Sequence, residues 1–130
     1  MSNSPLIAIV DDDDDVREAL FDLLQVEGFS ALTFADGAAL LAHAAALDFD
    51  CIITDVRMAG VDGLELQRQL RGRGSITPVI FITSSVEDLT RTQALQEGAC
   101  AWFTKPVADE ALLEAMRIAL GRSGGGAPGR

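Results

Sequence analysis

The sequence has few of the residues that build disulfide frameworks or transition-metal centres. Its 130 residues include two cysteines and one histidine, and neither cysteine has a nearby histidine or a Cys-x-x-Cys partner. This pattern argues against a disulfide, a metal-binding cysteine pair and a cysteine nucleophile. Cys51 and Cys100 lie inside apolar runs, which is typical of small core residues in a reducing compartment. His43 has no acidic or cysteine partner at ligand spacing, so we expect it at the surface or half-buried.

Basic residues and long hydrophobic runs are also scarce. Ten Lys and Arg residues stand against 20 Asp and Glu, which gives a net charge of −10. Such a charge argues against binding of nucleic acid or of an anionic membrane by this chain, because both need a basic surface. No apolar run approaches the length of a membrane span, and residues 1–5 do not resemble a signal peptide. We therefore expect a cytoplasmic protein.

The residues that are present indicate a single α/β domain. Hydrophobic residues make up 48% of the chain, enough for a core that buries roughly two-thirds of the unfolded surface. Short apolar runs alternate five times with longer amphipathic segments, which predicts a parallel sheet with helices on both faces. The expected strands are Leu6–Val10, Phe29–Phe34, Cys51–Thr54, Val79–Ile82 and Ala99–Phe103.

The helical segments are bounded by capping residues and glycines. Asp36 can cap the second helix, and Asp14 and Asp15 can lie solvated at the positive end of the first. Gly28 and Gly98 are placed to end the first and fourth helices. The five expected helices cover residues 16–27, 38–47, 64–72, 86–96 and 112–120. We expect one domain over residues 1–122, and a flexible tail or the start of a linker over residues 123–130.

Polar residues of complementary chemistry follow four of the expected strands. Asp11 and Asp12 follow the first strand, Asp55 the third, Thr83 the fourth and Lys105 the fifth. The carboxyl ends of parallel strands share one edge of the sheet, where open α/β sheets place their ligands. We therefore expect these side chains to converge.

A convergent group of aspartates would need a cation. Two carboxylates about 4 Å apart repel by roughly 4 kcal/mol at an effective dielectric constant near 20. Oxygen ligands with open positions suit Mg²⁺, which could neutralise an incoming phosphoryl group and leave Asp55 as the nucleophile. Lys105 would add a fixed positive charge, and the Thr83 hydroxyl a hydrogen bond, for the same phosphoryl oxygens.

Taken together, these motifs resemble the receiver domain of bacterial two-component response regulators, from about Leu6 to Leu120. The matching residues are Val10-Asp11-Asp12, Thr54-Asp55-Val56-Arg57-Met58, Gly63, Ile82-Thr83-Ser84 and Lys105-Pro106. The resemblance implies a flavodoxin-like doubly wound (βα)5 fold, with a five-stranded sheet in the order 2-1-3-4-5.

The same resemblance implies a phosphoacceptor site. Asp55 would accept a phosphoryl group from a histidine kinase or a phosphotransfer protein. Asp12 would bind Mg²⁺ directly and Asp11 through water, with Asp55 and the backbone carbonyl of Arg57 as further ligands. Mn²⁺ would be a substitute for Mg²⁺. Asp13 remains an alternative neighbour of the metal.

The resemblance also implies a switch. Lys105 would contact the phosphoryl group, Thr83 would move toward it, and Trp102 would occupy the place of the aromatic switch residue. The output surface, also a homodimer surface, would be formed by the fourth helix, fifth strand and fifth helix. In two places the chain departs from the family: Ala59 replaces the usual proline, and Trp102 replaces a tyrosine or phenylalanine.

Three alternatives to this interpretation remain. A Mg²⁺-dependent phosphohydrolase with an aspartate nucleophile usually has a second aspartate two residues later, where this chain has Arg57. A flavodoxin-like binding module would need a phosphate-binding loop after the first strand, where this chain has aspartates. A degenerate receiver would act without phosphorylation. The interpretation we prefer is a signalling receiver that catalyses only its own phosphorylation and dephosphorylation at Asp55.

Overall fold

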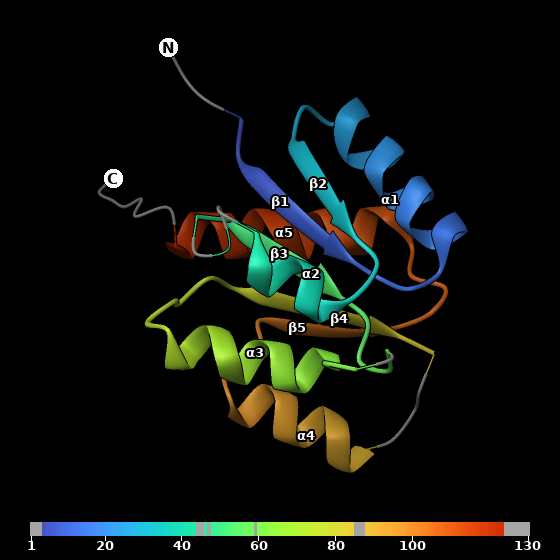
Figure 1. The fold of residues 1–130 in the computed structure, drawn as a ribbon. Helices are drawn as coiled ribbons and strands as arrows, with labels where there is room; N and C mark the ends of the chain where they lie inside the picture. Colours follow the sequence, from blue (N-terminus) through green and yellow to red (C-terminus); the bar gives the residue numbers. More distant parts are fainter. Residues whose placement is uncertain (1–3, 44–45, 47, 59, 85–87, 124–130) are drawn as a thin grey trace.

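The computed structural model describes residues 4–43, 46, 48–58, 60–84 and 88–123. Within them, strands and helices alternate along the chain (Figure 1). The elements are β1 (Leu6–Val10), α1 (Asp14–Val26), β2 (Ser30–Phe34), α2 (Gly37–Ala42), β3 (Cys51–Thr54), α3 (Gly63–Gly72), β4 (Val79–Thr83), α4 (Asp88–Gln96), β5 (Ala101–Thr104) and α5 (Asp109–Ser123).

The strands form one parallel sheet in the order β2-β1-β3-β4-β5, which confirms the predicted fold and strand order. The three inner strands are almost completely buried, as continuous apolar runs require when helices cover both faces. The edge strands β2 and β5 are more exposed.

Two hydrophobic clusters lie on opposite faces of the sheet. Along β1, Ala8 and Val10 point into the cluster that α2, α3 and α4 cover, whereas Ile7 and Ile9 point into the cluster covered by α1 and α5. Figure 1 shows the same arrangement, with α1 and α5 on one side of the sheet and the other helices opposite. The alternation follows from the two-residue period of a strand.

Strands β2 and β5 begin later than expected because the preceding helices use the first residues to close their ends. The N–H groups of Phe29 and Ala99 each donate to the carbonyl five residues earlier, at 2.9 Å in both cases. Gly28 (φ 90°) and Gly98 (φ 106°) allow this left-handed turn at the helix terminus, as predicted.

The prediction that the second helix extends to residue 47 was wrong. Asp36 caps α2 as expected, accepting from the Ala39 N–H at 2.8 Å, but the helix ends at Ala42. His43 has extended backbone (φ −75°, ψ 144°), and its ring contacts the rings of Phe34 and Phe49 at centroid distances of 5.4 and 6.3 Å. These aromatic contacts accompany the early end of the alanine-rich segment.

Several expectations fall outside the described residues. These are residues 44, 45 and 47 of the predicted second helix, the start of the fourth at 86, the substitution at Ala59, and the tail from residue 124 onward. Helix α5 continues through Ser123, which is three residues beyond the expected end of the helix at 120 and one beyond the expected end of the domain at 122. Among the described helices, none has the length and apolar character needed to cross a lipid bilayer.

Candidate functional site

Hydrogen bonds between neighbouring strands continue one residue beyond their ends and fix the backbone of the candidate site. Each bond runs from a backbone N–H to a backbone carbonyl oxygen: from Asp11 to Phe34 (3.1 Å), from Asp55 to Val10 (3.0 Å) and from Lys105 to Thr83 (2.8 Å). Asp11, Asp55 and Lys105 therefore begin their loops at one edge of the sheet, with their backbones held by adjacent strands. The peptide bond between Lys105 and Pro106 is cis.

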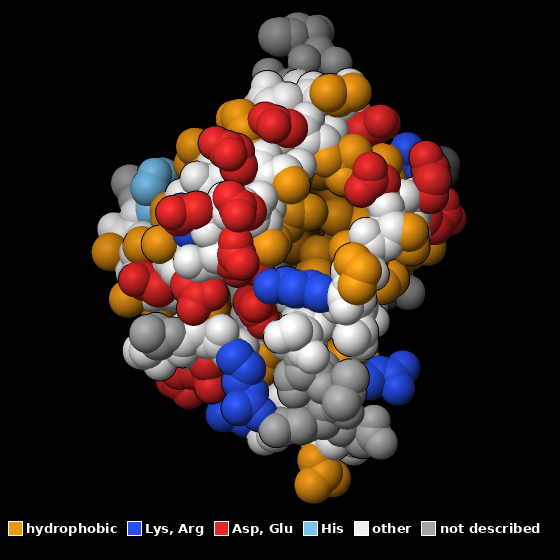
Figure 2. Space-filling view, turned by 90° about the vertical axis from the view of Figure 1, so that its right-hand side faces the viewer, with side chains coloured by type: hydrophobic (Ala, Val, Ile, Leu, Met, Phe, Trp, Pro, Cys, Tyr) orange, Lys and Arg blue, Asp and Glu red, His pale blue; other side chains and the backbone are white. Residues whose placement is uncertain are grey.

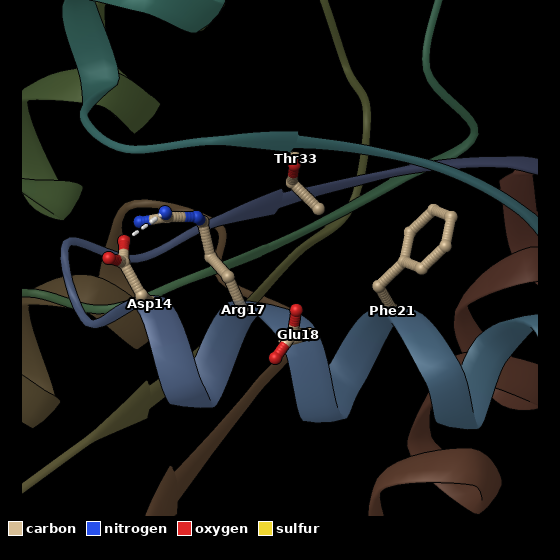
Figure 3. Close-up of a pocket in the computed structure, with 5 residues that line it drawn as sticks. All are labelled: Asp14, Arg17, Glu18, Phe21 and Thr33. Carbon is tan, nitrogen blue, oxygen red and sulfur yellow. Dashed lines mark hydrogen bonds and ion pairs between the residues drawn. The ribbon is translucent and has the colours of Figure 1, made fainter.

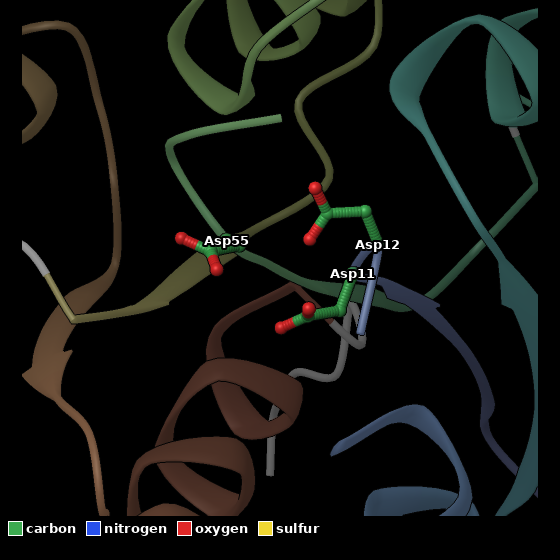
Figure 4. Close-up of side chains that lie close together, drawn as sticks. All are labelled: Asp11, Asp12 and Asp55. Carbon is green, nitrogen blue, oxygen red and sulfur yellow. The ribbon is translucent and has the colours of Figure 1, made fainter. Parts of the chain in front are cut away.

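Three carboxylates meet at this edge, and we call Asp11, Asp12 and Asp55 the acidic pocket (Figure 4). One carboxylate oxygen from each residue lies within 4.8 Å of the others. Asp11 and Asp55 are buried, with 2% and 6% of their surface exposed, whereas Asp12 is exposed. The convergence of aspartates from two separate strands is the arrangement predicted for a cation site.

Lys105 bridges the two buried members of the pocket. Its Nζ lies 3.0 Å from Asp11 Oδ2 and 2.8 Å from Asp55 Oδ2. Burial alone would lower the pKa of Lys105, but the hydrogen bonds and charges of the two carboxylates outweigh it and raise the pKa above its usual range. Burial raises the pKa of Asp11, and the Asp13 N–H and the Lys105 ammonium only partly oppose that effect.

The Asp55 carboxylate is held at both oxygens. Its Oδ1 accepts from the N–H groups of Val56 (2.6 Å) and Arg57 (3.3 Å), while Oδ2 contacts Lys105. The Arg57 side chain is exposed. Gly63, the first residue of α3, lies against the same loop, because a Cβ there would be 2.3 Å from the Asp55 carbonyl oxygen. The start of α3 therefore fixes the loop that carries Asp55.

Thr83 and Trp102 lie next to this edge on β4 and β5. Thr83 is completely buried at the end of β4, the strand adjacent to the one that precedes Asp55. Trp102 is half-buried, and its ring packs against Phe81 at a centroid distance of 5.6 Å and an interplanar angle of 40°. The aromatic residue thus packs from the edge strand β5 onto β4, against the residue two positions before Thr83.

Sequence reasoning missed the roles of Asp13, in the β1–α1 loop, and of Arg17, near the start of α1. Asp13, expected as an alternative neighbour of the metal, caps α1 by accepting from the Asp15 and Val16 N–H groups at 2.9 and 3.2 Å. An aspartate just before a helix is a recognisable capping signal. Arg17 donates from Nη1 to the Asp11 carbonyl oxygen at 2.7 Å, and no local pattern indicated this contact.

An apolar groove of about 270 Å³ opens beside Lys105, between α1 and the β5–α5 connection. It is lined mainly by aliphatic side chains, and the residues include Leu20, Leu23, Ile82, Pro106 and Val107. Figure 2 shows this end of the molecule, where acidic side chains gather next to exposed hydrophobic ones. The acidic pocket therefore lies beside an apolar groove that Lys105 helps to line.

A parallel sheet in this order, with carboxylates and a lysine gathered at its carboxyl edge, is the flavodoxin-like arrangement. Residues 7–117 match the response regulator receiver domain, and the chain belongs to this family. The predicted family is thereby confirmed, and with it the role of a phosphoacceptor domain in two-component signalling. The phosphohydrolase and the flavodoxin-like binding module are not favoured.

Individual relatives are consistent with this assignment. The chain is 40% identical over 123 residues to the transcriptional regulatory protein FixJ of Azorhizobium caulinodans, covering 95% of this chain and 58% of that protein. It is 40% identical over 115 residues to the response regulator protein TmoT of Ectopseudomonas mendocina, covering 88% of this chain and 52% of that protein. The chain thus spans little more than half the length of these curated relatives.

Among solved structures, the chemotaxis protein CheY4 of Vibrio cholerae superposes with a TM-score of 0.83 at 30% identity. The match covers 91% of this chain and 100% of CheY4. Receiver domains bind Mg²⁺ at an acidic pocket and are phosphorylated by histidine kinases. The donor set here fits that ion, because three carboxylates offer only hard oxygen ligands within reach of one another.

Proposed function

We propose that Asp55 accepts a phosphoryl group from the phosphohistidine of a histidine kinase or a phosphotransfer protein. The observation that supports this most directly is the shared environment of its carboxylate. Oδ1 is held by backbone N–H groups, Oδ2 contacts Lys105, and one of the two oxygens lies within 4.8 Å of carboxylate oxygens of Asp11 and Asp12. A nucleophilic oxygen is thus oriented by the backbone and placed where negative charge can be neutralised.

In the transfer step, a carboxylate oxygen of Asp55 bonds to phosphorus as the phosphorus–nitrogen bond to the donor imidazole breaks. The bonding electron pair returns to the imidazole nitrogen, and the product is an aspartyl phosphate. Lys105 already lies 2.8 Å from the reacting carboxylate, so its ammonium can move to the new phosphoryl oxygens over a short distance. Such transfers depend mostly on positioning and on neutralising charge.

Asp12 would bind Mg²⁺ directly and Asp11 through water, with Asp55 and the Arg57 carbonyl as the other protein ligands. The bound ion would neutralise the phosphoryl oxygens, and Mn²⁺ would substitute for it. The exposed Asp12 and the buried Asp11 suit these different roles, since the ion enters from the solvent side.

The chain would act as a switch rather than as a multiple-turnover enzyme, catalysing only its own phosphorylation and dephosphorylation. Thr83 at the end of β4 would move toward the phosphoryl group, and Trp102 would change its environment with it. The output surface would be the face of α4, β5 and α5, where Leu89 and Ile118 expose 86% and 48% of their surface. A homodimer in the phosphorylated state would use the same face.

The test is phosphorylation by a small acyl phosphate in the presence of Mg²⁺, followed by mass spectrometry. We expect the wild-type protein to gain one HPO₃ unit, and Asp55→Asn to gain none. Asp22→Asn, which removes an exposed carboxylate from the middle of α1, is the matched control and should be modified as wild type is. Modification that persists in Asp55→Asn, or that is absent from the wild type, would contradict the proposal.

A further inference from the structure

Arg17 reaches from the first turns of α1 back to the end of β1. Its Nη1 donates to the Asp11 carbonyl oxygen at 2.7 Å, and its Nη2 pairs with the Asp14 carboxylate. Figure 3 shows the guanidinium extending from α1 toward Asp14, at one end of a surface pocket of about 430 Å³. Only 20% of the Arg17 side chain is exposed, so the contact is partly shielded from water.

The contact closes a ring of hydrogen bonds around the β1–α1 loop. The Asp13 N–H donates to Asp11 Oδ1 at 2.9 Å, and the Arg17 N–H donates to the Asp13 carbonyl at 3.0 Å. The Asp13 side chain caps α1, and Arg17 then returns from that helix to the backbone of Asp11. Asp11 and Asp13, the two neighbours of Asp12, are therefore both fixed to α1. Together they set the direction in which the Asp12 side chain points away from the backbone.

We propose that Arg17 is a positioning residue for the acidic pocket. It holds the main chain at Asp11, so that the carboxylates of Asp11 and Asp12 face Asp55 before any cation arrives. This inference rests on the proposed function, in which these three residues hold Mg²⁺. A preformed pocket binds an ion more tightly, because the ion does not have to order the loop.

A purely electrostatic role for Arg17 would change the affinity for the metal in the opposite direction. The guanidinium is a positive charge near a group of carboxylates, and charge alone would repel a divalent cation. If Arg17 acted only through its charge, its removal would tighten Mg²⁺ binding. If it positions the loop, its removal weakens binding in spite of the charge that is lost.

The experiment is a calorimetric titration of the full chain with Mg²⁺ alone. We expect Arg17→Gln to bind Mg²⁺ about tenfold more weakly than wild type, the size typical for groups that orient metal ligands. Arg17→Lys keeps the charge but not the planar fork that spans carbonyl and carboxylate, so it should also bind more weakly. Binding in both variants as tight as wild type, or tighter, would overturn the proposal.

A control variant and a second measurement distinguish a failure of the positioning role from a failure of the proposed metal pocket. Arg117→Gln removes the same charge near Glu27, at the far end of α1 and roughly 20 Å away, and should leave affinity within about twofold. In the metal-free protein, the Asp13 amide should exchange with solvent faster in Arg17→Gln and Arg17→Lys than in wild type. Unchanged exchange would count against positioning. Wild-type protein that binds no Mg²⁺ would contradict the proposed metal pocket itself.

Discussion

Helices α3 and α4 lie next to each other on the same side of the sheet, yet they are held in different ways. Helix α3 buries Leu64, Leu66 and Leu70 in the core. Among the described side chains of α4, Ala94 alone is buried, and Leu89 is 86% exposed. The difference shows that α3 is part of the core, whereas α4 lies over it.

Besides the burial of Ala94, polar contacts join the two helices toward the end of α4. Arg68 forms hydrogen bonds of 2.9 and 3.1 Å with Glu97, just beyond α4. Gln67 Nε2 and Arg71 Nη2 approach the Ala94 and Gly98 carbonyls at 3.4 Å. The Arg68–Glu97 pair is partly exposed, so water can replace it at little cost, and we expect α4 to move more easily than α3.

The sharpest test of this difference makes the same substitution in each helix. Leu66→Ala should lower the free energy of unfolding by about 2–5 kcal/mol, because it leaves a cavity at a fully buried position. Leu89→Ala should change it by less than about 0.5 kcal/mol, because that side chain is already in solvent. Urea denaturation measures both, and similar losses in the two variants would mean that α4 is as firmly packed as α3.

A second test concerns the start of α3, which fixes the loop of Asp55. Gly63→Ala places a methyl group 2.3 Å from the Asp55 carbonyl oxygen and 2.8 Å from the Phe81 ring, so something must shift. We expect a loss of about 1–3 kcal/mol in stability, typical of overpacking, together with slower phosphorylation.

Gly72→Ala is the matched control in the same helix. Nothing lies within 4 Å of the Cβ that it would add, and alanine favours helix more than glycine does. The free energy of unfolding should therefore rise by about 0.5–1 kcal/mol. If Gly63→Ala were as well tolerated as Gly72→Ala, the close packing of α3 on the Asp55 loop would be wrong.

Much of this site could be predicted because a parallel sheet brings the carboxyl ends of its strands to one edge. Short apolar runs located those ends, and Asp11, Asp55 and Lys105 meet there as expected, while Thr83 ends the neighbouring strand β4. The order of residues along the chain could not indicate contacts that depend on tertiary packing. The Arg17 bond to the Asp11 carbonyl is one example, since it depends on how α1 lies against its own loop.

The end of α2 shows the same limit. Alanines favour a helix through residue 47, yet His43 turns away and contacts Phe34 and Phe49. Local propensity is worth only tenths of a kcal/mol per residue, so tertiary contacts of this kind can override it. The positions of polar residues that follow strands could be predicted from the sequence. The end of a helix that depends on tertiary packing could not.

Lys105 links the end of β5 to the ends of β1 and β3, because it contacts the carboxylates of Asp11 and Asp55 that follow those two strands. Its pKa is raised above the usual 10.5, since the two carboxylates outweigh burial. The pairing therefore contributes stability that is complete below pH 10.5 and is lost as the pH rises through the folded pKa. We expect the metal-free protein to lose stability in that alkaline range.

Lys105→Met isolates this contribution. Burial raises the pKa of the Cys51 thiol to about 12, so stability also falls with rising pH because the unfolded chain deprotonates first. Lys105 is the only lysine in the sequence, and there is no tyrosine. Urea denaturation of both proteins between pH 9 and 12 should show a smaller loss for Lys105→Met. Equal losses would mean that the ammonium does not stabilise the fold through Asp11 and Asp55.

A smaller effect than those of Leu66→Ala and Gly63→Ala is expected at the contact between the two helices. Gln67 is fully buried, and its Oε1 has no hydrogen-bond partner among the described residues. Its Nε2 donates to the Ala94 carbonyl over a long 3.4 Å, and that carbonyl also accepts from the Ala99 N–H at 2.9 Å. Gln67→Leu should therefore raise the free energy of unfolding by up to about 1 kcal/mol, because it removes a buried oxygen without leaving an unsatisfied carbonyl.

The same substitution should reduce the difference between α3 and α4. With an apolar contact in place of a weak polar one, amide hydrogens of α4 should exchange more slowly, while those of α3 should be little changed. Gln69→Leu, on the same helix but bonded to Glu65 at 3.1 Å, is the control and should leave α4 exchange unaltered. Faster exchange of α4 in Gln67→Leu would show that the amide of Gln67 holds α4 in place, and that the polar contacts between these helices are stronger than their geometry indicates.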